Sequence, residues 1–158
     1  MTNDIGMKKN KKYTQEEGSL NILNEPSVAY GLNPIGNASQ LIKYARQGIN
    51  MQYLNNLTNR LSLNLQEIGE ILHLSLRTLQ RYAPSKVLDS DASAKVLNLA
   101  ALQSHGLEVF GSEKDFNEWL RSEIPYLGNK TPLSYLDTPF GFTLIDQTLG
   151  RIEHGLFA

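Results

Sequence analysis

The residues best suited to chemistry lie close together near the middle of the chain. Arg77 and Arg81 are one helical turn apart, with Gln80 beside them. An arginine can grip guanine in bidentate fashion, and a glutamine can do the same to adenine. Lys86 and Arg60 are suited to backbone phosphates. The candidate DNA-binding residues are therefore Ser75, Arg77, Thr78, Gln80, Arg81 and Lys86.

Other kinds of chemistry find little support. His73, His105 and His154 are far apart and have no metal-ligand spacing. The chain has no glycine-rich phosphate loop and no nucleophile elbow. Asp137 and Asp146 could form an acid–base pair, but helix capping and surface solvation explain them more simply. We therefore expect no catalytic residues, no metal and no cofactor. Turnover of any substrate by the purified protein would contradict this expectation.

The candidate DNA-binding residues must be positioned by the elements around them, and residues 64–84 predict a helix-turn-helix. Asn64 can cap the first helix, with Glu67 completing a capping box. Ser75 can cap the second helix, and Pro84 ends it because the residue before a proline avoids helical angles. In DNA-binding versions of this motif, the second helix enters the major groove.

The second helix is expected to pack through one face and to expose the other. The predicted inward side chains are Leu76, Leu79 and Tyr82. The predicted outward side chains are Arg77, Thr78, Gln80 and Arg81. We expect Gly69 to allow the second helix to cross close over the first. His73 stands in the turn where glycine is usual, and histidine tolerates left-handed angles better than most residues. An ordinary helical hairpin remains the alternative.

The charge is unevenly distributed along a nearly neutral chain with a net charge of −1. Residues 43–86 carry six bases and two acids, a balance of +4, whereas residues 87–158 carry five bases and ten acids, a balance of −5. A basic segment followed by an acidic one suggests phosphate attraction in the middle and a different task at the end. Chance blocks of charge on solvated faces are the alternative.

The rest of the chain is read as helical, with no alternating strand pattern. We expect a flexible tail over 1–36, a helix-turn-helix domain over 37–108 and a smaller helical domain over 109–158. Asn37 and Asn50 are expected to cap two helices, and a longer helix is expected from Asp91 to Gly106. Prolines after Thr131 and Thr138 suit first helical positions. The last helix is predicted to present one apolar stripe: Ile145, Thr148, Leu149, Ile152 and Leu156. The predicted fold class is all-α.

The chain has no cysteine, no recognisable signal peptide and no run of about 18 apolar residues that could span a membrane. These features predict a cytoplasmic protein without a membrane partner.

Several short motifs toward the end of the chain add a family resemblance. They are Val109-Phe110-Gly111, Phe116 to Leu120, Leu127-Gly128, Thr131-Pro132-Leu133, Leu136 to Pro139 with Gly141, and Leu149 to Gly155. In this order they resemble the toxin-binding end of the Xre/MbcA/ParS antitoxin family, and Ser75 and residues 77–81 also look like that family. The likeness covers roughly residues 51–158. Ile124-Pro125-Tyr126 and Gly128-Asn129-Lys130 depart from the family pattern, so contacts in that one loop are expected to differ.

This resemblance implies the antitoxin half of a type II toxin–antitoxin pair. The partner would be a RES-domain toxin that consumes NAD, and the antitoxin itself would hold no NAD. The complex would repress its own operator, with the antitoxin as a homodimer or in a larger toxin-bridged assembly. The candidate toxin-binding residues are Trp119, Leu120, Leu136, Arg151, Glu153, His154 and Gly155.

Alternatives remain open at this point. Trp119 has helical spacing with Phe116 and could be a core residue. Arg151 could pair with Asp146 or Glu153 on a solvated face. The whole chain could also be a stand-alone transcriptional regulator, or a protein-interaction module that ignores DNA.

Overall fold

A computed structural model describes residues 38–156, and this part of the chain is helical with no β-strand. The all-α prediction is therefore confirmed. Its elements are α2 (Ala38–Gln47), α3 (Met51–Arg60), α4 (Leu65–Leu72), α5 (Leu76–Arg81), α6 (Ser90–Phe110), α7 (Glu113–Arg121), the 3₁₀ helices η2 (Pro125–Leu127) and η3 (Pro132–Tyr135), and α8 (Pro139–Glu153). The predicted tail over 1–36 and the predicted cap at Asn37 lie outside the described residues.

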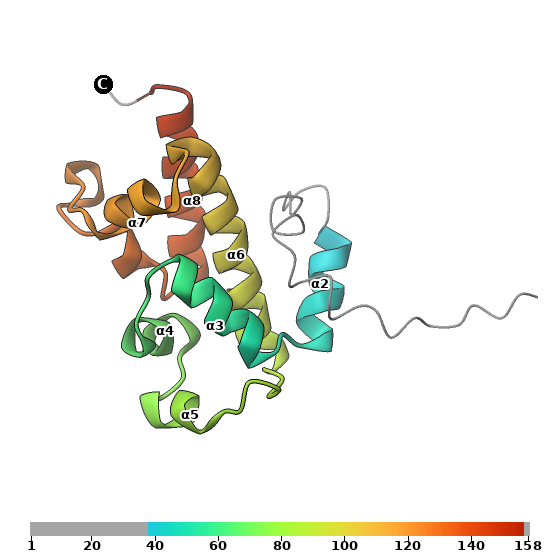
Figure 1. Cartoon of the computed structure of the whole chain (residues 1–158). Helices are drawn as coiled ribbons and strands as arrows, with labels where there is room; N and C mark the ends of the chain where they lie inside the picture. Colours follow the sequence, from blue (N-terminus) through green and yellow to red (C-terminus); the bar gives the residue numbers. More distant parts are fainter. Residues whose placement is uncertain (1–37, 157–158) are drawn as a thin grey trace, which may run out of the picture.

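The longest helix, α6, runs through the middle of the molecule (Figure 1). It packs against α2 on one side and against α7 and α8 on the other, and it also contacts α4. Buried side chains from every one of these helices form one continuous apolar core. Since the hydrophobic effect is the main favourable term in folding, this shared core fixes the helix-turn-helix against the C-terminal helices.

The boundaries of α6 differ from the prediction at both ends. Asp89, not Asp91, caps the helix, because its side chain accepts a hydrogen bond from the Ala92 amide at 2.8 Å. The helix continues through Gly106 and ends at Phe110, where Gly111 adopts a left-handed conformation with φ 76°. The predicted boundary between residues 108 and 109 therefore falls inside α6, so the two predicted domains share this helix.

The loop after α5 is joined to the start of α3. The amide of Met51 donates to the Lys86 carbonyl at 2.9 Å, and the amide of Leu88 donates to the Ile49 carbonyl at 2.8 Å. The fully buried Ser93 hydroxyl accepts from the Ile49 amide at 2.9 Å, which satisfies a polar group inside the core. These bonds fix where the chain leaves the helix-turn-helix.

The C-terminal helices α7 and α8 each begin at a side-chain cap, and the one at Thr138 agrees with the prediction. Ser112 caps α7 by accepting from the Asp115 amide at 3.1 Å, and Thr138 caps α8 by accepting from the Gly141 amide at 3.1 Å. Thr131 makes no side-chain cap, and Pro132 opens a 3₁₀ turn instead of an α-helix. The predicted stripe of α8 is buried at Ile145, Thr148 and Leu149.

The prediction that Leu156 belongs to this stripe is wrong. Leu156 is 68% exposed, because α8 ends at Glu153 and the chain then turns at Gly155 with φ 64°. Leu156 therefore lies beyond the helix and away from its buried face.

Candidate functional site

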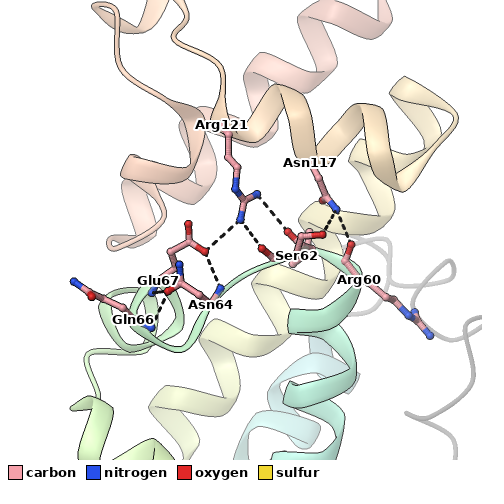
Figure 2. Close-up of polar contacts among 8 residues, drawn as sticks. Arg60, Ser62, Asn64, Gln66, Glu67, Asn117 and Arg121 are labelled. Carbon is pink, nitrogen blue, oxygen red and sulfur yellow. Dashed lines mark hydrogen bonds and ion pairs between the residues drawn. The ribbon is translucent and has the colours of Figure 1, made fainter.

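The first helix of the predicted helix-turn-helix begins with the predicted capping box. The Asn64 side chain accepts from the amides of Gln66 and Glu67, both at 2.9 Å, while Glu67 Oε2 accepts from the Asn64 amide at 2.8 Å (Figure 2). A good N-cap contributes about 1 kcal/mol. The sequence signal for the start of α4 is therefore confirmed.

The turn between α4 and α5 passes through His73, which has left-handed angles of φ 57° and ψ 39°. A Cβ added at Gly69 would lie 2.7 Å from the Leu74 carbonyl oxygen but 3.8 Å from Leu79 Cδ1. A side chain at Gly69 would thus collide mainly with the backbone of the turn, at the Leu74 carbonyl. This corrects our expectation that the crossing of the second helix demands it.

Helix α5 buries less than the sequence predicted. Leu79 is buried and Tyr82 is half-buried, but Leu76 is 45% exposed, so Leu76 does not belong to the inward set. A helix of six residues has room for only a narrow buried face, and Leu79 occupies it.

The candidate DNA-binding residues divide into two groups. Arg77, Gln80 and Arg81 are exposed on α5, and Lys86 is exposed just after it, with its Nζ 5.5 Å from the centre of the Tyr82 ring. Ser75 and Thr78 are engaged with each other. The Ser75 hydroxyl accepts from the Thr78 amide at 3.1 Å, and the two hydroxyl oxygens are 2.7 Å apart. The hydrogen bonds between these two residues therefore stabilise the N-terminus of α5.

Arg60, expected to reach DNA phosphates, lies elsewhere on the surface. It lines a groove at the end of α3 together with Lys114 and Glu118 of α7. This position faces the C-terminal region, so Arg60 is not part of the α5 surface.

A second candidate surface is formed by α7, η2 and α8. Trp119 is half-buried, and its ring centre lies 5.4 Å from that of Phe110 and 6.0 Å from that of Phe116. Aromatic pairs at such distances are favourable. This cluster packs Trp119 against the core, while the residue as a whole stays half-buried, so its role as a contact residue remains a prediction.

Two of the candidate toxin-binding residues are core residues. Leu120 is 1% exposed and Leu136 is 0% exposed. Neither side chain can touch a partner in this fold, and both are removed from the candidate surface. Their place in the family motifs reflects packing, which is how many apolar motif residues act.

The end of α8 carries the remaining candidates. The Arg151 guanidinium lies over the Tyr126 ring, 4.8 Å from its centre, and donates a hydrogen bond to the Tyr126 hydroxyl. It pairs with neither Asp146 nor Glu153. Those carboxylates instead face His105, with Nδ1 2.7 Å from Asp146 and Nε2 3.6 Å from Glu153. His154 is exposed, and Gly155 turns the chain after it.

Sequence analysis missed two exposed aromatic residues beside these candidates. Phe140 is 87% exposed near the start of α8, and Tyr126 is 53% exposed in η2. The helical period contained a signal for Phe140. At about 100° per residue, Phe140 lies about 140° away from Ile145 but within about 20° of Arg151. Phe140 and Arg151 therefore share one exposed stripe of α8.

Within residues 38–156, no cluster of histidine, aspartate and glutamate side chains could hold a metal ion. No helix among these residues is long and apolar enough to cross a membrane.

Comparisons with known proteins match both halves of this arrangement. Residues 40–101 match the model of the antitoxin Xre-like helix-turn-helix domain, and residues 105–155 match that of the antitoxin Xre/MbcA/ParS C-terminal toxin-binding domain. The first match ends and the second begins within α6.

Individual proteins that are similar to this chain are named as antitoxins. The chain is 26% identical to an antitoxin Xre of Photorhabdus laumondii over 78% of this chain and 84% of that protein. It is also 26% identical to a Prs ADP-ribosylating antitoxin of Sphingobium, over 72% of this chain and 77% of that protein. A chain in the crystal structure of the M. tuberculosis MbcT–MbcA toxin–antitoxin complex aligns with a TM-score of 0.49 and 18% identity, covering 66% of this chain and 93% of that chain. With both of its domain models matched in order, the chain belongs to the Xre/MbcA/ParS antitoxin family.

Proposed function

We propose that this protein neutralises a RES-domain toxin that consumes NAD by binding it directly, and that the complex represses its own operon. The observation that carries the proposal is the exposed stripe of α8 within the region matched to a toxin-binding domain. Large aromatics and arginines dominate the energetics of protein interfaces. Phe140 at one end of the stripe and the Arg151–Tyr126 pair at the other supply both kinds of side chain.

The toxin-binding surface in this proposal consists of exposed and half-buried residues only. Its members are Trp119, Tyr126, Phe140, Arg151, Glu153, His154 and Gly155. Arg151 is suited to carboxylate or phosphate groups of the partner because its guanidinium is planar and always charged. The antitoxin takes no part in the toxin's reaction and needs no cofactor or metal of its own.

DNA binding in this proposal uses α5. Arg77, Gln80 and Arg81 face the solvent together, as a base-reading set must. Ser75, Thr78 and Lys86 would add backbone contacts. A two-fold operator needs two such helices about 34 Å apart, which calls for a homodimer or a toxin-bridged assembly in the cytoplasm.

The test separates the two activities. The neighbouring reading frames are expressed in a host with and without this chain, while growth and cellular NAD are measured. Arrest with falling NAD, rescued by this chain, is the expected result. Substituting Arg77 and Arg81 by alanine should abolish operator binding and leave rescue intact. Substituting Phe140 and Arg151 by alanine should weaken rescue and leave operator binding by the antitoxin alone intact.

A stand-alone regulator is the second candidate, and the α5 surface favours it because Arg77, Gln80 and Arg81 are already exposed in the chain by itself. Operator binding without a toxic neighbour would support this function. Toxicity that this chain fails to rescue would also count against the antitoxin proposal.

A further inference from the structure

The helix-turn-helix is attached to the C-terminal region by side chains of α7. Arg121 Nη2 donates to the Ser62 carbonyl at 2.7 Å and to Glu67 Oε2 at 3.2 Å, while Nη1 lies 3.4 Å from the Leu61 carbonyl (Figure 2). Asn117, one turn earlier on the same face of α7, donates to the Arg60 carbonyl at 2.8 Å. We call these two α7 side chains, with the α3–α4 junction they hold, the clamp.

The clamp satisfies groups that the sequence of the junction leaves without partners. The last carbonyls of a helix have no intrahelical donor. Those of Arg60 and Leu61, at the end of α3, receive donors from α7 instead. Ser62 has a left-handed backbone with φ 52°, which is uncommon for a residue other than glycine. The donors from α7 thus help to fix a turn that its own residues do not favour.

Glu67 has two roles at once. One of its oxygens, Oε2, accepts from the Asn64 amide in the capping box and also pairs with Arg121. The same Glu67 carboxylate therefore caps the start of α4 and pairs with Arg121 of α7. A second bond acts at the other end of α4, where His73 Nε2 donates to the Asp137 carbonyl at 2.6 Å. Because a carbonyl can only accept, the proton of this bond belongs to His73.

These contacts join elements of the proposed toxin-binding surface to α4, the helix that packs against α5. Trp119 lies on α7 between Asn117 and Arg121, and Asp137 directly precedes the cap of α8. A partner that fixes α7 and α8 would also fix both ends of α4, and α4 supports α5. Coupling of this kind travels through packed elements and hydrogen-bond networks.

We propose that Arg121, with Asn117, is a positioning residue through which toxin bound to α7 and α8 raises the affinity of the helix-turn-helix for operator DNA. This inference rests on the proposed function. Couplings between sites are typically about 5- to 150-fold. The toxin is therefore expected to raise operator affinity at least about 5-fold in the native chain, and Arg121→Gln should bring this factor to within about 2-fold of one.

The experiment measures operator affinity by fluorescence anisotropy, using a duplex from the region upstream of this gene. Each variant is titrated with and without the purified toxin encoded by the neighbouring frame, and toxin affinity is measured separately. The matched control is Lys114→Gln. It removes a positive charge from the same helix, but Lys114 is exposed and contacts only Glu118, at 3.9 Å, in the described ion pairs. This control should keep the full coupling factor.

Arg121→Lys keeps the charge but cannot donate from two nitrogens. This variant tests the inference if Arg121→Gln does not fold. It should lower the coupling factor while toxin affinity stays native. Native coupling in both Arg121 variants, or no coupling in the native chain, would overturn the inference while leaving both binding activities standing. Failure of the native chain to bind toxin or operator would instead overturn the proposed function and the inference together.

Discussion

Substituting Gly106 by alanine tests the packing that supports Trp119. Gly106 lies inside α6, where alanine normally stabilises a helix by about 1 kcal/mol relative to glycine. A Cβ at this position, however, would lie 2.3 Å from Cδ2 and Cε2 of Phe116 and 2.5 Å from its Cζ. Ordinary carbon contacts are about 3.5–4.0 Å, so the ring must move.

The ring of Phe116 has little room in which to move. It is 1% exposed and packs against both Phe110 and Trp119. Overpacking in a core costs about 1–3 kcal/mol, and three close ring atoms place this case near the upper end. After the gain in helix propensity is subtracted, Gly106→Ala should lower the free energy of unfolding by about 2 kcal/mol.

The matched control is Gly150→Ala in α8, where a new Cβ would meet nothing within 4 Å. The same substitution there should raise the free energy of unfolding by about 0.5–1 kcal/mol. Urea denaturation followed by circular dichroism measures both variants, with similar m-values required. If Gly106→Ala were as stable as the native protein, or if both variants shifted in the same direction, the steric reasoning would be refuted.

Three further predictions concern the two surfaces and the turn. Arg81→Ala should weaken operator affinity by about 1–3 kcal/mol if Arg81 reads a base, whereas Lys95→Ala on α6 should not; loss of affinity in both would indicate a nonspecific charge effect. Phe140→Ala should weaken toxin binding about 10-fold or more in calorimetry without changing thermal stability, because the side chain is 87% exposed; native affinity would exclude it from the interface. The free energy of unfolding of His73→Gly should lie within about 1 kcal/mol of the native value, because relief of the left-handed backbone offsets the lost hydrogen bond. That of His73→Ala should be about 1 kcal/mol lower than the native value. Equal stability of the alanine variant and the native protein would show that the bond to Asp137 does not stabilise the fold.

Local signals predicted the parts of this fold that depend on neighbouring residues. The capping box of Asn64 and Glu67, the cap at Ser75 and the cap at Thr138 each join groups two or three positions apart. Such bonds form wherever the helix forms, so residue type and spacing were sufficient to predict them. The end of α6 was not predictable in this way. Gly106 resembled a stop signal, but its lack of a side chain serves the ring of Phe116, whose position depends on how α7 folds back.

The residues of the candidate site also differ in whether local sequence signals could predict their exposure. The exposed residues of α5 followed from the helical period, whereas burial of Leu120 and Leu136 depended on tertiary packing. Arg121 resembled an ordinary cation near the end of a helix. Its partners lie 54 to 60 residues earlier in the chain, beyond the reach of any local pattern.

His73 suggests how such long-range contacts can be detected in a sequence. A turn that usually requires glycine has a histidine here, with left-handed angles that cost a side-chain-bearing residue free energy. The structure supplies the compensating contact, a hydrogen bond to the Asp137 carbonyl on the far side of the groove between α4 and η3. Ser62 repeats the pattern, since its left-handed turn is held by Arg121 and Asn117 of α7. At both ends of α4, a residue that local geometry disfavours is therefore stabilised by the C-terminal region. This dependence predicts that the helix-turn-helix will lose its fixed geometry when expressed without α7 and α8.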